Sequence, residues 1–173
     1  VAHDLDHQGW FLLRKYTQPD MRKAIGLFEQ AIARDSLFAA PWSGIAWAWT
    51  NLAGAYLSPR DAYPRARAAA EHALRLDPTS SEAHAQLAWV LLGYDWNPRG
   101  AEKEFQVAIA GDSRNAGAHQ GLAAVRWTSG DTPGAVLEAQ RAVSADPQVA
   151  YAQIDLAGYF GILHRADSAQ AAL

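Results

Sequence analysis

One spacing recurs along the 173 residues and limits the folds that this chain can adopt. Small residues keep it, with steps of 42, 35, 34 and 34 residues: Ala24, Ala66, Ala101, Ala135 and Ala169. Larger apolar residues run parallel to them: Phe11, Ile45, Leu87, Leu122 and Leu156. A period near 34 is typical of solenoids made of helical hairpins, each of which buries its apolar face only by stacking on its neighbours. The spacing therefore predicts a scaffold with a long concave surface, and it favours binding over catalysis.

Each repeat contains two stretches in which apolar residues recur every three or four positions, the pattern of an amphipathic helix. The expected repeats cover about 5–38, 39–80, 81–115 and 116–149, with a partial fifth at 150–173, and together they form one domain. In the fourth repeat, Gly130 ends the first helix and Asp131 or Thr132 caps the second, with Pro133 in its first turn. No alternating β-branched stretch reaches five residues. We therefore expect an all-α solenoid of stacked antiparallel hairpins.

The composition argues against several classes of function. The net charge is −3, so the chain lacks the basic stripe of a nucleic-acid surface, and we expect no nucleic-acid partner. The longest apolar run is about five residues, far below the ~20 that span a bilayer, so we expect no membrane segment. Without cysteine there is no disulfide and no thiolate metal site. We expect no cofactor and a cytoplasmic location, although a cysteine-free chain is equally compatible with an oxidising compartment.

Sequence motifs of enzymes are absent: there is no G-x-x-x-x-G-K, G-x-G-x-x-G, G-x-S-x-G or H-E-x-x-H. His3 and His7 lie four residues apart, but two ligands at a chain end make a weak metal pair. His84 and His119 occupy equivalent positions in successive repeats, and we interpret them as packing residues with a satisfied ring nitrogen. The chain starts without Met and stops inside a helical pattern, so we interpret it as a piece of a longer, non-enzymatic protein.

Two repeats depart from the period. Repeat two is longer by eight residues, and the extra segment falls at about 55–63. We expect it to extend the first helix of that repeat and then to form a longer turn that leads to Pro64. Repeat three has one extra residue close to 94–98. Insertions of this kind map to loops on one edge of a solenoid.

One repeat carries residues that point to a family. The series is Trp42-x2-Ile45-Ala46-x2-Trp49, followed by Ala66, Ala70, Ala73 and Pro78. It resembles the tetratricopeptide repeat (TPR) pattern of Trp, Leu, Gly, Tyr, Ala, Phe, Ala and Pro. His84 and His119 stand where the first aromatic residue is usual, as does Gln8 in the first repeat. The resemblance covers essentially the whole chain, and it implies a right-handed superhelix whose inner groove binds a protein or peptide.

A narrower resemblance rests on longer stretches. They are residues 22–33, the insertion that ends in Pro64-Arg65-Ala66-Arg67, and Tyr94-Asp95-Trp96 before residues 101–105. These stretches are similar to the TPR region fused to bacterial winged-helix transcriptional activators, adenylate cyclases and serine/threonine kinases. In such proteins the repeats sense signals or bind partners. The resemblance therefore implies the interaction region of a bacterial regulator or signalling protein.

The TPR resemblance also implies which residues line the groove, because in that family the first helix of each hairpin faces inward. The inward positions hold Trp47 and Asn51 in repeat two, Trp89 in repeat three, and Gln120, Trp127 and Thr128 in repeat four. Three half-exposed Trp side chains would offer on the order of 300 Å² of aromatic surface. Trp is also enriched at binding hot spots. We therefore predict a peptide-binding groove at these six residues, whose polar members bond the peptide backbone.

Other interpretations stay open. The indoles could fold against neighbouring hairpins and enlarge the core, or they could stack on the ring of a small ligand. Ile154, Leu156 and Phe160 could support a homo-oligomer, because a cut solenoid exposes the apolar face that a further helix would cover.

Overall fold

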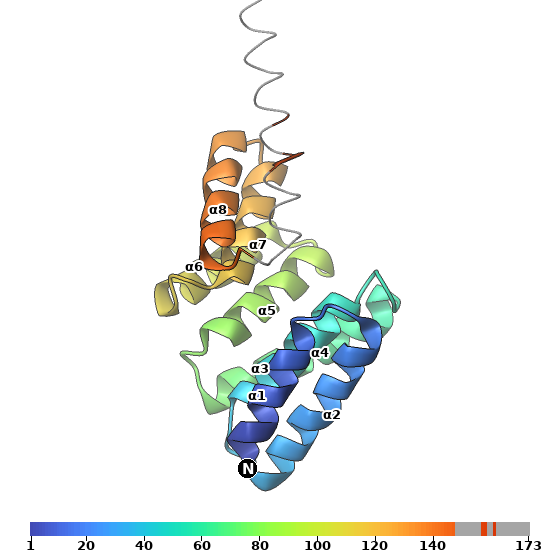
Figure 1. Ribbon diagram of the computed structural model, residues 1–173. Coiled ribbons are helices and arrows are strands. Elements are labelled where there is room, and N and C mark those ends of the chain that lie inside the picture. Colours follow the sequence, from blue (N-terminus) through green and yellow to red (C-terminus); the bar gives the residue numbers. More distant parts are fainter. Residues whose placement is uncertain (148–156, 159–160, 162–173) are drawn as a thin grey trace, which may run out of the picture.

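The computed structural model describes residues 1–147, 157–158 and 161, and eight helices account for most of the first range (Figure 1). In chain order they are α1 (Ala2–Leu13), α2 (Gln18–Arg34), α3 (Ala40–Leu52), α4 (Pro59–Leu76), α5 (Ser81–Gly93), α6 (Pro98–Gly111), α7 (Ala116–Thr128) and α8 (Thr132–Ala145). The part of the chain described here contains no strand, which confirms the all-α expectation. The partial fifth repeat at 150–173, with Ile154, Leu156 and Phe160, falls almost entirely outside the described residues.

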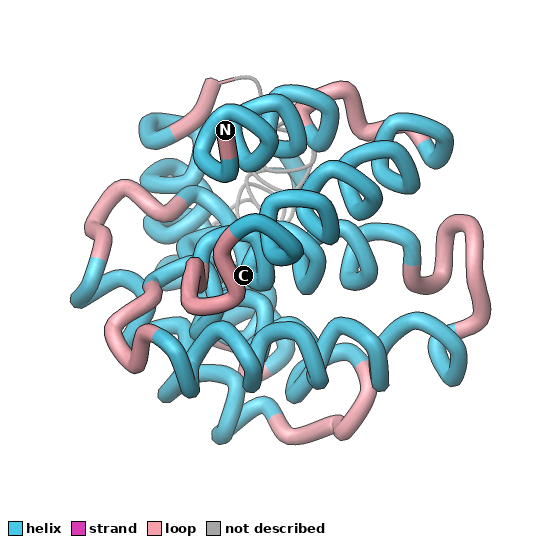
Figure 2. Tube along the Cα trace, turned by 90° about the horizontal axis from the view of Figure 1, so that it is seen from below, coloured by secondary structure: helices cyan, strands magenta, loops and turns pink. Residues whose placement is uncertain are grey.

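The helices form two layers. Consecutive helices pair as the hairpins α1–α2, α3–α4, α5–α6 and α7–α8, and each hairpin stacks on the next through α2–α3, α4–α5 and α6–α7 contacts. The first helices also contact one another, α1 with α3, α3 with α5 and α5 with α7, so they form a continuous inner layer. The hairpins turn relative to one another from the blue α1–α2 to the orange α7–α8 (Figure 1). The loops lie around the periphery of the stack (Figure 2).

An aspartate closes each hairpin that the structure describes. Asp35, Asp77, Asp112 and Asp146 follow the last helical residue, and each takes an extended conformation while its N–H bonds back into the helix. The side chain of Asp35, Asp77 and Asp112 accepts the N–H two residues on, at 2.9–3.1 Å. This Asx turn stops the helix and directs the chain into the next hairpin. The periodic aspartates of the sequence are therefore repeat terminators.

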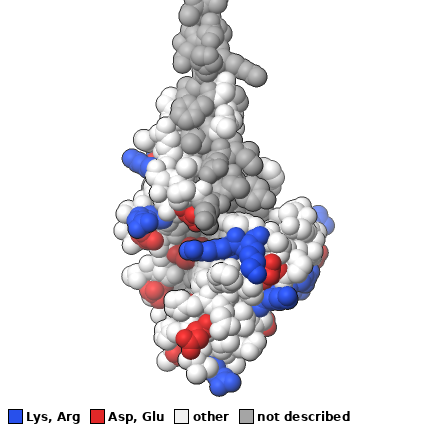
Figure 3. Space-filling view, in the orientation of Figure 1, with Lys and Arg blue, Asp and Glu red and all other residues white. Residues whose placement is uncertain are grey.

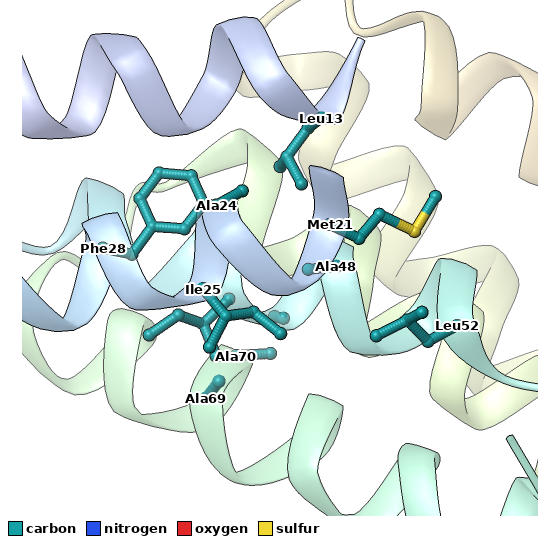
Figure 4. Close-up of a cluster of buried hydrophobic side chains, with 11 residues drawn as sticks. Leu13, Met21, Ala24, Ile25, Phe28, Ala48, Leu52, Ala69 and Ala70 are labelled. Carbon is teal, nitrogen blue, oxygen red and sulfur yellow. The ribbon is translucent and has the colours of Figure 1, made fainter. Parts of the chain in front are cut away.

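Phenylalanine opposite glycine sets the spacing between layers. Phe28 of α2 is fully buried, and its ring occupies the place where Gly9 of α1 and Gly44 of α3 lack side chains. A Cβ at Gly9 or Gly44 would lie 2.5 or 2.4 Å from a ring carbon, closer than atoms can approach. Figure 4 shows the Phe28 ring at one side of the buried cluster, next to Ala24. The periodic alanines are also fully buried, as close helix packing requires: Ala24, Ala66, Ala101 and Ala135.

The expected extension of the first helix in repeat two is wrong. α3 ends at Leu52 and has 13 residues, the same length as α5 and α7. Ala53 follows in an extended conformation and ends the helix, and Gly54 then takes a positive φ of 77° that turns the chain, which glycine adopts without strain. The extra residues instead form the turn 53–58 and the start of α4, which begins at Pro59 and has 18 residues. The end of this turn and the start of α4 line one hollow with the second insertion, so both insertions lie on the same edge, as predicted; the lining residues are Ser58, Pro59, Arg60, Gly93, Tyr94 and Trp96.

Candidate functional site

A groove of about 930 Å³ runs along the inner layer. Each first helix contributes side chains to it: Trp10 and Leu13 from α1, Trp47, Thr50 and Asn51 from α3, Glu82, Gln86 and Trp89 from α5, and Gln120 from α7. The loops after α1, α3 and α6 add Arg14, Tyr16, Tyr56, Asp112, Arg114 and Asn115. The groove therefore crosses all four described hairpins and has both aromatic and polar walls.

Two of the three predicted groove tryptophans, Trp47 and Trp89, lie in this groove and are partly buried. The Trp47 ring packs edge-on against the Tyr16 ring, with 5.2 Å between centroids. The Trp89 ring packs edge-on against the Phe105 ring, with 5.4 Å between centroids. Each indole is thus held by one aromatic neighbour while it also borders the groove. Such fixed, partly exposed aromatics suit binding, because little side-chain entropy is left to lose.

The third tryptophan, Trp127, is not among the residues that line the groove. It packs against the small buried cluster of Ala123, Ala135, Val136 and Ala139 between α7 and α8. Trp127 therefore agrees with the second interpretation, in which the indole packs against neighbouring helices and enlarges the core. Trp42 and Trp49 lie apart from the groove residues: Trp42 stacks on His72 at 4.1 Å, and the guanidinium of Arg65 lies 4.7 Å from the Trp49 ring.

Two of the three polar residues predicted for the groove lie in its lining, and the third does not. Asn51 and Gln120 line the groove, whereas Thr128 does not. The Asn51 amide donates to the carbonyl oxygen of Trp47 at 2.9 Å, which leaves its own oxygen available to a ligand donor. The Thr128 hydroxyl donates to the carbonyl oxygen of Val125 at 2.9 Å, so it serves its own helix end.

A carboxylate in the groove was not singled out from the sequence as a site residue. Glu82 on α5 accepts a hydrogen bond from Gln86 at 2.7 Å and a longer one from Asn115 at 3.4 Å. Asn115 also donates to Ser81 and caps α7 by accepting the N–H of Ala118. The spacing of Glu82, Gln86 and Trp89 could have shown that they share one face of α5. The TPR resemblance already places Trp89 at an inward position, and the structure shows Glu82 and Gln86 beside it in the groove.

Burial dominates the electrostatics of Glu82. Desolvation raises the pKa of this carboxyl, and the nearby negative charge of Asp112 acts in the same direction. The hydrogen bonds from Gln86 and Asn115 lower it and do not outweigh the desolvation. By contrast, the exposed carboxyl of Asp77 has a lowered pKa because the hydroxyl and the N–H of Thr79 bond its charged form. Glu82 is therefore a carboxylate in an environment that disfavours its charge.

Two histidines join the helices within their hairpins. His84 and His119 each contact a glutamate of the following helix, Glu104 and Glu138, at 2.7 Å through Nδ1. Their Nε2 atoms lie 3.1 Å from the carbonyl oxygens of Pro78 and Ser113. His119 is only 4% exposed, so the prediction of packing histidines with satisfied ring nitrogens is confirmed. Their glutamate partners lie 20 and 19 residues away in the sequence, too far for a local pattern to indicate them.

The structure gives no support to a metal site at the N-terminus. The His3 ring packs against Phe38, with 4.4 Å between centroids, instead of joining His7. Among the described residues, no three His, Cys, Asp or Glu side chains come close enough together to hold a metal ion. Within the same described residues, no helix is both long enough and apolar enough to cross a bilayer.

Comparison with known proteins supports the fold through structure alone. No protein-family model matches this chain, and no curated protein matches its sequence. A thermophilic TPR protein of Thermus thermophilus matches with a TM-score of 0.70 at 16% identity, over 92% of this chain and 81% of that one. PilW, a type IV pilus biogenesis factor, matches with a TM-score of 0.64 at 20% identity, over 93% and 75%.

A third neighbour is YrrB, described as a TPR protein with an unusual peptide-binding site. It matches with a TM-score of 0.53 at 17% identity, over 95% of this chain and 78% of that one. Identities of this size relate structures and not activities. The chain therefore has the fold of the tetratricopeptide repeat proteins.

Proposed function

We propose that the inner groove binds an extended segment of another protein by its apolar side chains. The observation that carries the proposal is the placement of Trp47 and Trp89, on α3 and α5, as partly buried walls of one groove. Tryptophans fixed in this way are enriched at binding hot spots. The groove volume of about 930 Å³ lies at the upper end of the range for ligand sites.

The shape and polarity of the groove favour a peptide over a compact ligand. Its walls come from four hairpins, so an occupant that fills it must be long. Asn51 and Gln120 lie in the same lining and can bond an extended backbone between the aromatic contacts. A peptide-binding site is also attributed to YrrB, which shares the fold. On this proposal the protein is a binding scaffold and not an enzyme.

The proposal predicts that binding depends on the two groove tryptophans. A selection of random displayed peptides against the protein provides the ligands, and fluorescence titration measures their affinities. We expect Trp47→Ala or Trp89→Ala to weaken binding by about 30-fold, near 2 kcal/mol, because each removes a central aromatic contact. The variants Trp47→Phe and Trp89→Phe, which retain a ring for packing, are expected to lose less.

The matched control is Trp96→Ala. Trp96 is 84% exposed and lies outside the groove, so its removal should leave the affinities unchanged. Equal binding by wild type and both groove variants would contradict the proposal. Selective binding of a free aromatic compound without any peptide would instead favour a small ligand. Concentration-dependent light scattering without added peptide would favour self-association.

The regulatory context is a further part of the proposal. The resemblance of residues 22–33 and of both insertions to TPR regions of bacterial activators, cyclases and kinases supports an interaction or sensory role in a cytoplasmic regulator. Sequencing the open reading frame around this segment tests it. A winged helix, kinase or cyclase encoded beside it is expected, and a frame that encodes none of them would refute this part.

A further inference from the structure

One face of α5 brings to the groove a carboxylate without a counter-charge and an amide oxygen without a donor. Glu82, Gln86 and Trp89 follow one another at steps of four and three residues, so their side chains share a face. All three line the groove. The Gln86 side chain is 2% exposed, and its Oε1 atom has no hydrogen-bond donor. Its nitrogen is already engaged, because Nε2 donates to Glu82.

Glu82 lacks a positive partner in the same place. Both its hydrogen bonds come from neutral amides, those of Gln86 and Asn115. In the part of the chain that the structure describes, no Lys, Arg or His forms an ion pair with it. A desolvated carboxylate without a counter-charge is costly, and a buried acceptor without a donor adds to that cost. Gln86 thus lacks a hydrogen-bond donor and Glu82 lacks a positive charge, and one cationic donor would supply both.

The chemistry of these groups selects an organic cation over a metal ion. Calcium and magnesium require about six oxygen ligands, and the described residues hold no cluster of three acidic or histidine ligands. A guanidinium group offers five N–H donors in a plane, stacks on aromatic rings and sheds water more readily than an ammonium group. Trp89 supplies an aromatic wall on the same face of α5. The negative charge of Asp112 is also close enough to act on Glu82.

We propose that the groove binds an arginine side chain of its ligand at Glu82 and Gln86, beside Trp89. This inference rests on the proposed peptide-binding function and names the residue that the peptide must carry. The guanidinium donates to the Glu82 carboxylate and to the vacant oxygen of Gln86. Cation–π contact with the Trp89 indole adds to these bonds.

The other charges of the groove limit what surrounds that arginine. Arg14 and Arg114 also line the groove, and both are exposed. On the face drawn in Figure 3, basic and acidic side chains are interspersed. Asp112 and Asp146 line the groove too, so with Glu82 the described lining holds three acidic and two basic side chains. The expected ligand is therefore a segment whose arginine lies at Glu82 and whose acidic neighbours can pair with Arg14 or Arg114.

The test compares two probes that differ in charge and hardly in shape, N-acetyl-arginine amide and N-acetyl-citrulline amide. Titration by NMR follows the indole N–H signal of Trp89. We expect the arginine probe to bind at least about 10-fold more tightly, because a charged donor replaces a neutral one. Glu82→Gln should reduce that preference to about 2-fold or less, and Gln86→Met should weaken the arginine probe. Glu71→Gln, which changes an exposed carboxylate on α4, should have no effect.

The outcomes separate this inference from the proposed function. Equal binding of both probes to the wild type would overturn the arginine site without reference to any variant. Selected peptides that need Trp47 and Trp89 but contain no arginine would overturn it and leave the peptide groove intact. If the arginine probe shows its preference and no peptide is selected, the cation site stands and the peptide function fails. Thermal unfolding of Glu82→Gln and Gln86→Met verifies that both variants fold.

Discussion

At the scale of single residues, the packing rests on volume matched between layers. Phe105 repeats the arrangement of Phe28: it is fully buried, and Gly121 of α7 leaves room for its ring. Between these two phenylalanines, repeat two has Ala70 at the equivalent place, and Gln86 rather than glycine follows in the next hairpin. Gln86, which lines the groove, therefore lies where the Phe–Gly pairing between hairpins is interrupted.

Gly121 provides a direct test of this volume match. A Cβ there would lie 2.0 Å from the Phe105 ring, so Gly121→Ala should destabilise the protein by about 1–3 kcal/mol through overpacking. Gly26 on α2 is the control, because a Cβ there meets nothing within 4 Å. Gly26→Ala should stabilise by about 0.5–1 kcal/mol through helix propensity. Urea unfolding measures both, and a neutral Gly121→Ala would contradict the account.

Glu82 should make stability depend on pH in an unusual direction. Its pKa is raised in the folded state, so folding favours the protonated form, and that contribution is lost as the pH rises from the ordinary value through the raised one. At pH 7 the ionised carboxylate is therefore a burden, and Glu82→Gln should melt at a higher temperature than the wild type. The difference should vanish as the pH is lowered toward 4. A variant that is less stable than the wild type at pH 7 would refute this, with Glu71→Gln as the control.

At the scale of elements, local side-chain caps start five of the eight helices that the structure describes. Side chains of Thr17, Ser80, Asn97, Asn115 and Asp131 accept the N–H three residues on and cap α2, α5, α6, α7 and α8. Such caps satisfy N–H groups that the helix leaves unpaired. The caps of α5 and α7 lie 35 residues apart and those of α6 and α8 lie 34 apart, whereas α1, α3 and α4 begin without a side-chain cap. The predicted choice between Asp131 and Thr132 as the cap of α8 falls on Asp131.

The cap of α6 can be tested without touching the groove. Asn97 accepts the N–H of Gly100 at 3.0 Å, and it lies on the edge formed by the insertions. Asn97→Ala should cost about 1 kcal/mol, whereas Asn97→Asp keeps an acceptor and should cost little. Hydrogen exchange should show the loss in the first turn of α6. Equal exchange in the two variants would mean that the cap does not hold this helix end.

At the scale of the whole molecule, the stacking of hairpins creates the groove, which no single hairpin could form. The inner helices α1, α3, α5 and α7 contact one another in sequence, and the groove is the surface that they share. Trp47 on α3 and Trp89 on α5 lie 42 residues apart, the length of repeat two, so they hold the same place in successive repeats, and both border the groove. Trp127 lies three residues beyond the equivalent place, which Ala124 holds, and it packs between α7 and α8. An indole therefore borders the groove or enlarges the core according to its place on the inner helix.

The sequence by itself determined the hairpins: their period, their caps, their terminating aspartates and the small residues between layers are all local signals of a few residues. Through the TPR resemblance it also indicated four residues that line the groove, Trp47, Asn51, Trp89 and Gln120. The tertiary structure alone decided that Trp127 and Thr128 lie off the groove lining and that the eight-residue insertion leaves α3 unchanged in length. It alone placed Glu82 against Asn115, 33 residues away, and desolvated it. Helix periodicity follows from neighbours three and four residues apart, whereas burial and charge follow from contacts between hairpins, which a single repeat does not encode.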